Sequence, residues 1–311
     1  MNLQEFYAFR KKNTLQMKQH AKVRAVNLVC VFLLIGIGFV YLYPIIYMCV
    51  MSVMPTEDLV NPTIQWIPTA LDFESFSLVS GLLEYPKTLA STFFLATVCA
   101  ALSTAVCCLV GYALARYPVP LKKVWTLILL LVFILPVDVL AVPRYVLFTQ
   151  FHLVGTIWSV LLPAMFGQGL KSSLCILLFM QSFGSYPKSY DEAAELDGAR
   201  KGQIFLRVAI PMAIPVIVLT FLLSFIWYWN ETAQTGMYLS GSLQTLPLKL
   251  EQFDALYNTA MSVGSGSSAN RLNERIQMTA TIMAIAPLIL LYFGFQKSLI
   301  SSIESSGVTG E

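Results

Sequence analysis

Long stretches with few or no charged residues recur along the chain, separated by segments that hold most of the charges. A helix needs about 20 mostly apolar residues to cross the roughly 30 Å hydrocarbon core of a bilayer. Six stretches are this long, four without a charge and two with one or two: 26–54, 88–115, 124–148, 157–182, 208–230 and 276–296. The pattern predicts an all-α, polytopic membrane helix bundle of about six transmembrane helices, with the transmembrane domain over residues 26–300.

The composition agrees with a lipid-facing surface. The 311 residues are 57% hydrophobic and only 12% charged, whereas soluble domains carry about 25% charged residues. The formal net charge of +3 is small, so we expect the lipid bilayer as a partner and no nucleic acid.

The distribution of Lys and Arg predicts the orientation, because basic residues are retained on the cytoplasmic side. Six lie in the N-terminal segment 1–25, and further clusters lie in the short segments 116–123 and 185–211. The longer segments 55–87 and 231–275 are poorer in basic residues for their length and are expected outside. Both termini, including the tail 301–311, are therefore expected in the cytoplasm of a prokaryotic cell, with this chain a multi-pass protein of the cell membrane.

The residue types that usually carry catalysis or bind metals are few and scattered. All six Cys residues lie within apolar stretches without metal-binding spacing, and the two His residues are far apart. The phosphate-binding pattern GxxxxGK[ST] does not occur in the sequence. We expect no enzyme activity, no metal and no cofactor on this chain.

The segment 185–211 is the most informative one between the apolar stretches. Ser189 followed by Glu192 is typical of a capping box at a helix start, and Gly198 suits the left-handed residue that ends a helix. We predict a short helix over residues 189–197. The small and apolar side chains of Ala193, Ala194 and Leu196 lie among charges, which fits either a docked partner protein or a solvated interfacial helix.

This segment resembles the EAA loop of ABC importer permeases. Glu192-Ala193-Ala194 is followed after three residues by Gly198, and after nine more by Val208-Ala209-Ile210-Pro211. The family pattern has Ile and Leu where Val208 and Ile210 stand. The flanking segments 111–123, 133–148 and 224–231 are similar to the second permease of carbohydrate importers of the maltose and glycerol-phosphate group.

The resemblance implies a subunit that forms half of a translocation path for a carbohydrate, such as an oligosaccharide, rather than one that hydrolyses ATP. Its implied partners are a second homologous permease, two ATP-binding-cassette ATPase subunits that bind ATP and magnesium, and an extracytoplasmic solute-binding protein. It further implies contact with the ATPase through a set of residues in the loop: Ser189, Glu192, Ala193, Ala194, Leu196, Asp197, Gly198 and Pro211. A permease for an acidic sugar, peptide or amino acid, or an ion-coupled carrier, is the alternative.

Three ionisable residues lie inside the predicted spans, where a charge is costly unless it faces a cavity or a partner. Asp138, Arg144 and Lys171 are hypothesised to form ion pairs, to line the solute path, or to reach the membrane interface. The small residues around Lys171 indicate a loosened helix. Trp227, Trp229 and Asn230 suit contact with sugar rings, but aromatic residues also form the ordinary belt at the membrane interface.

Overall fold

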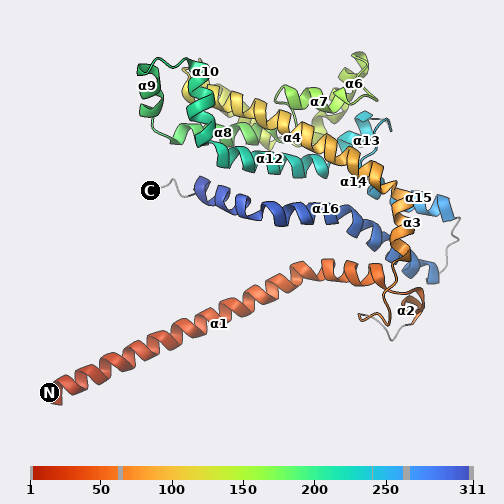
Figure 1. The fold of residues 1–311 in the computed structure, drawn as a ribbon, viewed down its shortest axis with the longest axis horizontal. Coiled ribbons are helices and arrows are strands. Elements are labelled where there is room, and N and C mark those ends of the chain that lie inside the picture. The colour runs from red at the N-terminus through yellow and green to blue at the C-terminus, as the bar shows by residue number, and fades with distance from the viewer. Residues whose placement is uncertain (1–2, 62–65, 240, 262–266, 308–311) are drawn as a thin grey trace. The chain divides into compact units, whose positions relative to one another are not determined.

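The structure, a computed structural model, describes residues 3–61, 66–239, 241–261 and 267–307 and contains no strand within these ranges. Helices account for nearly all of it, as Figure 1 shows, which confirms the all-α prediction. The chain divides into two compact units, one of residues 1–75 with 270–279 and one of residues 76–269 with 280–311.

The first unit is built on α1 (Leu3–Val53), whose residues 26–53 are long and apolar enough to span a membrane. After it, α2 (Thr56–Val60) folds back so that Met51, Met54 and Leu59 form a small buried cluster. Arg275 forms an ion pair with Asp72 at 2.8 Å. The backbone N–H of Glu74 and the Arg275 guanidinium hold the pKa of Asp72 below its usual value.

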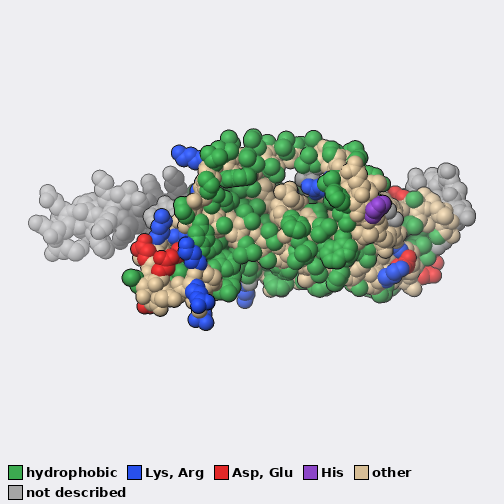
Figure 2. All heavy atoms as spheres, turned by 90° about the horizontal axis from the view of Figure 1, so that it is seen from above, with side chains coloured by type: hydrophobic (Ala, Val, Ile, Leu, Met, Phe, Trp, Pro, Cys, Tyr) green, Lys and Arg blue, Asp and Glu red, His purple; other side chains and the backbone are tan. Residues whose placement is uncertain are grey.

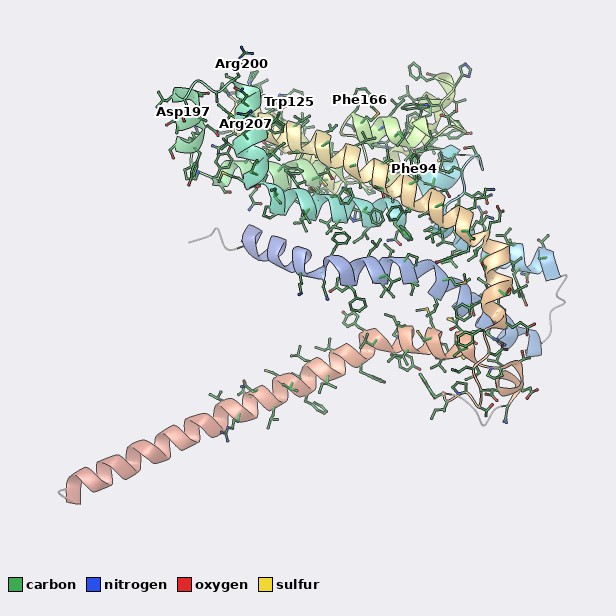
Figure 3. All side chains as sticks on the ribbon, viewed as in Figure 1. Phe94, Trp125, Phe166, Asp197, Arg200 and Arg207 are labelled. Atoms are coloured by element: carbon green, nitrogen blue, oxygen red, sulfur yellow. The ribbon has the colours of Figure 1, made fainter. Side chains whose placement is uncertain are left out.

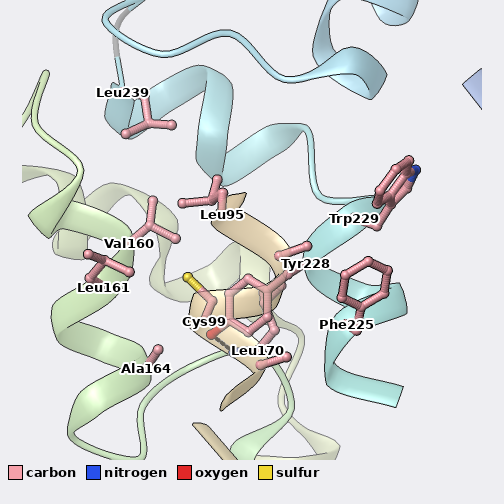
Figure 4. Close-up of a cluster of buried hydrophobic side chains, with 12 residues drawn as sticks. Leu95, Cys99, Val160, Leu161, Ala164, Leu170, Phe225, Tyr228, Trp229 and Leu239 are labelled. Carbon is pink, nitrogen blue, oxygen red and sulfur yellow. Dashed lines mark hydrogen bonds between the residues drawn. The ribbon is translucent and has the colours of Figure 1, made fainter. Parts of the chain in front are cut away.

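The core of the second unit forms around α4 (Tyr85–Arg116), which packs against α7 (Trp158–Met165), α8 (Ser172–Ser185) and α12 (Ile214–Trp229). Figure 4 shows one of its buried clusters, to which α4, α7 and α12 contribute side chains together with Leu170 and Leu239. At Gly111 of α4 an added Cβ atom would lie 2.4 Å from the Phe179 Cβ atom of α8. The two backbones approach this closely because glycine has no side chain, a common arrangement between membrane helices.

Two of the predicted spans are broken into shorter helices. The stretch 124–148 consists of α5 (Lys122–Ile134), the 3₁₀ turn η1 (Val137–Leu140) and α6 (Ala141–Gln150). The first break follows from Pro136, which cannot donate a backbone hydrogen bond and disfavours helical backbone at Leu135. The stretch 157–182 is divided between α7 and α8 by residues 166–171, where Gly167 and Lys171 have left-handed backbone (φ 69° and 49°). Neither stretch is a single helix, and the loosening expected near Lys171 is confirmed.

The fifth stretch is bent. Residues 201–212 comprise α10 (Lys201–Ile204), the π-helical turn η2 (Phe205–Ala209) and α11 (Ile210–Met212), and they meet α12 at 76°. Pro215 follows the bend, and its ring would clash with the carbonyl of Pro211 in a straight helix. Near the C-terminus, α16 (Ser267–Gly307) is continuous, and its residues 274–297 are long enough to span.

Among the described residues, three unbroken helices and one bent pair meet the requirements for crossing a membrane. The count of six spans and the cytoplasmic position of both termini stay predictions. Five short helices occupy the two segments expected outside: α2, α3 (Glu74–Leu83), α13 (Ala233–Leu239), α14 (Leu246–Glu251) and α15 (Phe253–Met261).

Several contacts fasten α14 to the start of α4. The ammonium group of Lys249, whose side chain is only 6% exposed, lies 2.6 Å from the Glu84 carboxylate. The hydrogen bonds from Lys249 and then from Lys87 lower the pKa of Glu84 to about 2. The contribution of this pair to stability is thus present above the ordinary pKa of a glutamate and is lost only as the pH falls toward 2.

We predict that Gly111→Ala destabilises the second unit by about 1–3 kcal/mol, because the new methyl group has no room between α4 and α8. Gly184→Ala is the matched control, since its Cβ atom would meet nothing within 4 Å. A thermal melt followed with a thiol-reactive dye measures this once the exposed Cys30 and Cys49 are replaced by Ser, because the other four cysteines are buried. Equal melting temperatures for the two variants would contradict the close packing at Gly111.

Candidate functional site

A short helix, α9 (Ser189–Leu196), carries most of the residues expected to contact a partner protein. It ends in a Schellman motif: the N–H of Ala199 donates to the Ala194 carbonyl at 2.9 Å, and that of Gly198 donates to Glu195 at 3.0 Å. Gly198 has φ 79°, a conformation that glycine adopts without a steric penalty. The prediction that Gly198 terminates this helix is confirmed.

The predicted capping box at the start of α9 is wrong. Lys188 is the N-cap residue, has helical backbone, and makes no side-chain capping bond. Ser189 is therefore already the first helical residue, one position too late for its hydroxyl to cap. The capping contact expected of Glu192 is instead made in the next helix by Gln203, whose Oε1 accepts a hydrogen bond from the N–H of Arg200 at 2.8 Å.

The base of α9 is tied to the last residue of α4 by a cluster of three side chains. The Arg116 guanidinium lies over the Tyr186 ring, 3.4 Å from its centroid, and donates to the Tyr186 carbonyl at 2.8 Å. It also forms an ion pair with Asp191 at 3.5 Å, and the Tyr186 hydroxyl donates to the same carboxylate at 3.1 Å. Burial raises the pKa of Tyr186 to about 12, so it stays a neutral donor at physiological pH.

This cluster was not predicted from the sequence, in which Arg116 is only one of the basic residues expected in the cytoplasm. The sequence does contain a signal for it: Arg116 ends a stretch rich in small residues, and Tyr186 and Asp191 lie on either side of the helix-breaking Pro187. Nothing in their spacing along the chain pairs them, because Arg116 and Asp191 belong to segments that only the packing of α4 on α8 brings together.

The two sides of α9 have different surroundings. Asp191, Glu192 and Glu195 line a hollow of about 150 Å³ together with residues of α4 and α10. Tyr190, Ala193 and Leu196 recur every third residue and are exposed, Leu196 at 89%. In Figure 3 this region can be found by the labels of Asp197, Arg200 and Arg207. The helix therefore presents an apolar strip outward, while its acidic residues border the hollow, with Glu192 and Glu195 themselves exposed.

A cavity of about 780 Å³ lies beside α5 and the break before α8. Arg144 and Lys171 both line it, so the structure brings together two of the three charges found inside the predicted spans. Neither forms an ion pair with a carboxylate among the described residues. The Lys171 ammonium instead lies 4.9 Å from the centre of the Trp227 ring. The side chain of Asp138 lies outside the described residues, so its expected role stays a prediction.

The backbone before Lys171 is held by Tyr228 of α12. The N–H of Leu170 donates to the Tyr228 hydroxyl at 3.1 Å (Figure 4). At Gly169 a Cβ atom would lie 2.3 Å from the same hydroxyl oxygen. Tyr228 thus supplies the partner that the interrupted helix no longer provides, and it fixes the start of α8.

The other residues expected near the solute take different positions. Trp229 is only 1% exposed and belongs to the buried cluster of Figure 4, so packing explains it better than solute contact. Asn230 is exposed, and its amide donates to the Ile226 carbonyl at 2.9 Å, which closes the end of α12. Trp227 is partly buried and contacts Lys171.

Comparison with known families gives a match over residues 108–305 to the binding-protein-dependent transport system inner membrane component. The chain belongs to this family. The matched residues include α9 and every residue that lines the cavity beside α5. The family assignment confirms the permease resemblance drawn from the EAA-like loop.

Several characterised permeases are similar to this one over nearly their whole length. The arabinooligosaccharides transport system permease protein AraQ of Halalkalibacterium halodurans is 25% identical, with 88% of this chain and 93% of the relative covered. The diacetylchitobiose uptake system permease protein DasC of Streptomyces coelicolor is 25% identical, with coverages of 91% and 96%. The crystal structure of a bacterial ABC transporter involved in the import of the acidic polysaccharide alginate has a chain with TM-score 0.71 and 24% identity, with coverages of 88% and 96%. This likeness supports the fold.

We predict that Arg116→Lys in this permease loosens α9 while leaving the charge in place, because Lys cannot both stack on Tyr186 and reach two acceptors. Backbone amides of residues 189–197 should exchange hydrogen about tenfold faster, the equivalent of about 1.4 kcal/mol. Hydrogen exchange measured by mass spectrometry on the purified chain checks this, with the exposed Arg207→Lys as the matched control. Unchanged hydrogen exchange in Arg116→Lys would show that Arg116 does not stabilise α9.

Proposed function

We propose that this chain is the permease subunit of an ATP-binding-cassette importer and forms half of the translocation path for a carbohydrate. The observation that carries the proposal is the family match combined with relatives named for arabinooligosaccharide and diacetylchitobiose uptake, which align over nearly their full length. The chain itself supplies the membrane path, and ATP with magnesium is bound and hydrolysed by partner chains.

The partners follow from this role. A second homologous permease completes the path, two ATPase subunits act on the cytoplasmic face, and an extracytoplasmic binding protein delivers the solute. A peptide, amino-acid or other solute is less favoured by the names of these relatives. Self-contained ion-coupled transport is not favoured by the family.

The apolar strip of α9 is the proposed contact with the ATPase. Leu196 is 89% exposed, so little of its side chain is buried within this chain, and the Schellman motif gives the helix a sharp end. Ala193 is small enough to enter a groove on another protein. Glu192 and Asp191, in contrast, face the hollow of the chain's own loop, so Glu192 orients the helix while Ala193 and Leu196 make the contact. Pro211 lies on the exposed part of α11 before the bend.

We predict that Gly198→Val weakens ATPase association or uncouples hydrolysis from uptake. A β-branched residue with left-handed backbone costs about 1–2 kcal/mol, and relief of that strain disturbs the end of α9. Gly241→Val is the matched control, because Gly241 has φ 81° and equal free space in the opposite loop. ATPase activity and solute uptake measured in the same proteoliposomes report both steps. Wild-type coupling in Gly198→Val would refute the contact.

The proposed orientation places the segments 55–87 and 231–275 outside the cell and α9 inside. Single cysteines in a cysteine-free chain should react with an impermeant maleimide in intact cells at Ser77 and Asn258, which are exposed. A cysteine at Ser189, also exposed, should react only after the cells are opened. Labelling of the cysteine at position 189 in sealed cells would contradict the proposed orientation.

A further inference from the structure

The cavity beside α5 has a charge that the proposed function does not explain. Carbohydrate importers in general need no fixed charge in the membrane, and each charge placed there is costly. Here two cationic side chains, Arg144 from α6 and Lys171 from the break before α8, line one space of about 780 Å³. The described part of the lining contains no carboxylate.

The surroundings of Lys171 hold it in a fixed position, and no described carboxylate forms an ion pair with either cation. Lys171 has left-handed backbone, which costs a residue other than glycine about 1–2 kcal/mol, and Tyr228 fixes the peptide immediately before it. Its ammonium group contacts the Trp227 ring, which orients a cation without removing its charge. Arg144 lies where α6 begins, beside the end of η1.

The remaining polar groups of the lining suit a sugar. Gln168 and Gln234 carry amides and Ser173 carries a hydroxyl, which together can both donate to and accept from ring hydroxyls. Trp125 of α5 adds an aromatic ring to the lining. The first turn of α8, a helix of 14 residues, also lines the space, and its positive end has the same sign as the two cations.

Figure 2 shows how unusual such a charge is on this surface. Hydrophobic side chains cover most of the face in view, and red and blue side chains gather toward its ends, while one basic side chain appears within a hollow between them. A basic group surrounded by apolar side chains attracts an anion more strongly than one in water does.

We propose that this cavity binds a carboxylate-bearing saccharide of the uronate type, with Arg144 and Lys171 as the groups that recognise the carboxylates. This deepens the proposed function and rests on it. Charge-assisted hydrogen bonds, bidentate for an arginine, distinguish a carboxylate from the hydroxymethyl group of a neutral sugar. The inference assigns the substrate class to the permease itself, independently of the binding protein that delivers the solute.

The test uses α-1,4-digalacturonate and α-1,4-galactobiose, which differ only in their carboxylate and hydroxymethyl groups. The full chain, purified with its partner subunits in nanodiscs of neutral lipid and without binding protein, is titrated with each sugar while tryptophan fluorescence is recorded. We expect digalacturonate to bind at least about tenfold more tightly than galactobiose. Arg144→Met and Lys171→Met should each weaken digalacturonate binding by about tenfold or more. Lys123→Met, the same change on α5 outside the cavity, should leave it unaltered.

Three results would overturn the inference. Equal binding of the two sugars would leave carbohydrate import intact and remove the preference for an acid. Wild-type binding of digalacturonate in both Met variants would mean that Arg144 and Lys171 do not recognise the carboxylates. Equally tight binding of glycerol phosphate would mean that the cations attract any anion. Failure of the proposed function is seen separately, as proteoliposomes of the complete importer that take up neither a neutral nor an acidic saccharide.

Discussion

Backbone groups that leave a helix inside a membrane must find partners within the protein, because the hydrocarbon core offers none. This constraint explains much of the second unit, in which two apolar stretches are interrupted and a third is bent by 76°. Between α7 and α8, the N–H of Leu170 donates a hydrogen bond to the Tyr228 hydroxyl. The continuous helix α4 lies against α7, α8 and α12 and gives these shorter pieces a common surface. The cavity beside α5 lies at one of these interruptions, where irregular backbone lines a space instead of facing lipid.

Much of this architecture was predictable from hydrophobic length and composition. The all-α class follows from the long apolar stretches, and the end of α9 follows from Gly198, because few residues other than glycine adopt its backbone conformation readily. The breaks were signalled by Pro136 and by the glycines before Lys171. Composition alone does not distinguish a kinked helix from two separate ones, since that depends on whether a neighbour satisfies the freed backbone groups.

The failures share a physical origin in contacts between distant segments. Ser189 and Glu192 have the spacing of a capping box, yet Tyr186 and Arg116 already hold the first turn, and the helix starts one residue earlier than a serine cap allows. Trp229 looked suitable for a sugar ring, but the packing of α12 on α4 places it in the core. The shared cavity of Arg144 and Lys171 could not be found by their separation in sequence, because the break before α8 sets the direction of Lys171.

The helix α4 has one further property. Its 32 residues make a continuous rod of about 48 Å, and an ion pair lies at each end: Glu84 with Lys249 just before it, and Arg116 with Asp191 on its last residue. A stiff rod fastened to α14 at one end and to α9 at the other transmits a displacement with little loss along its length. Any energetic link between the two loops is reciprocal. If a ligand that shifts α14 biases α9, then a protein that binds α9 must, by the same free energy, alter the affinity at α14.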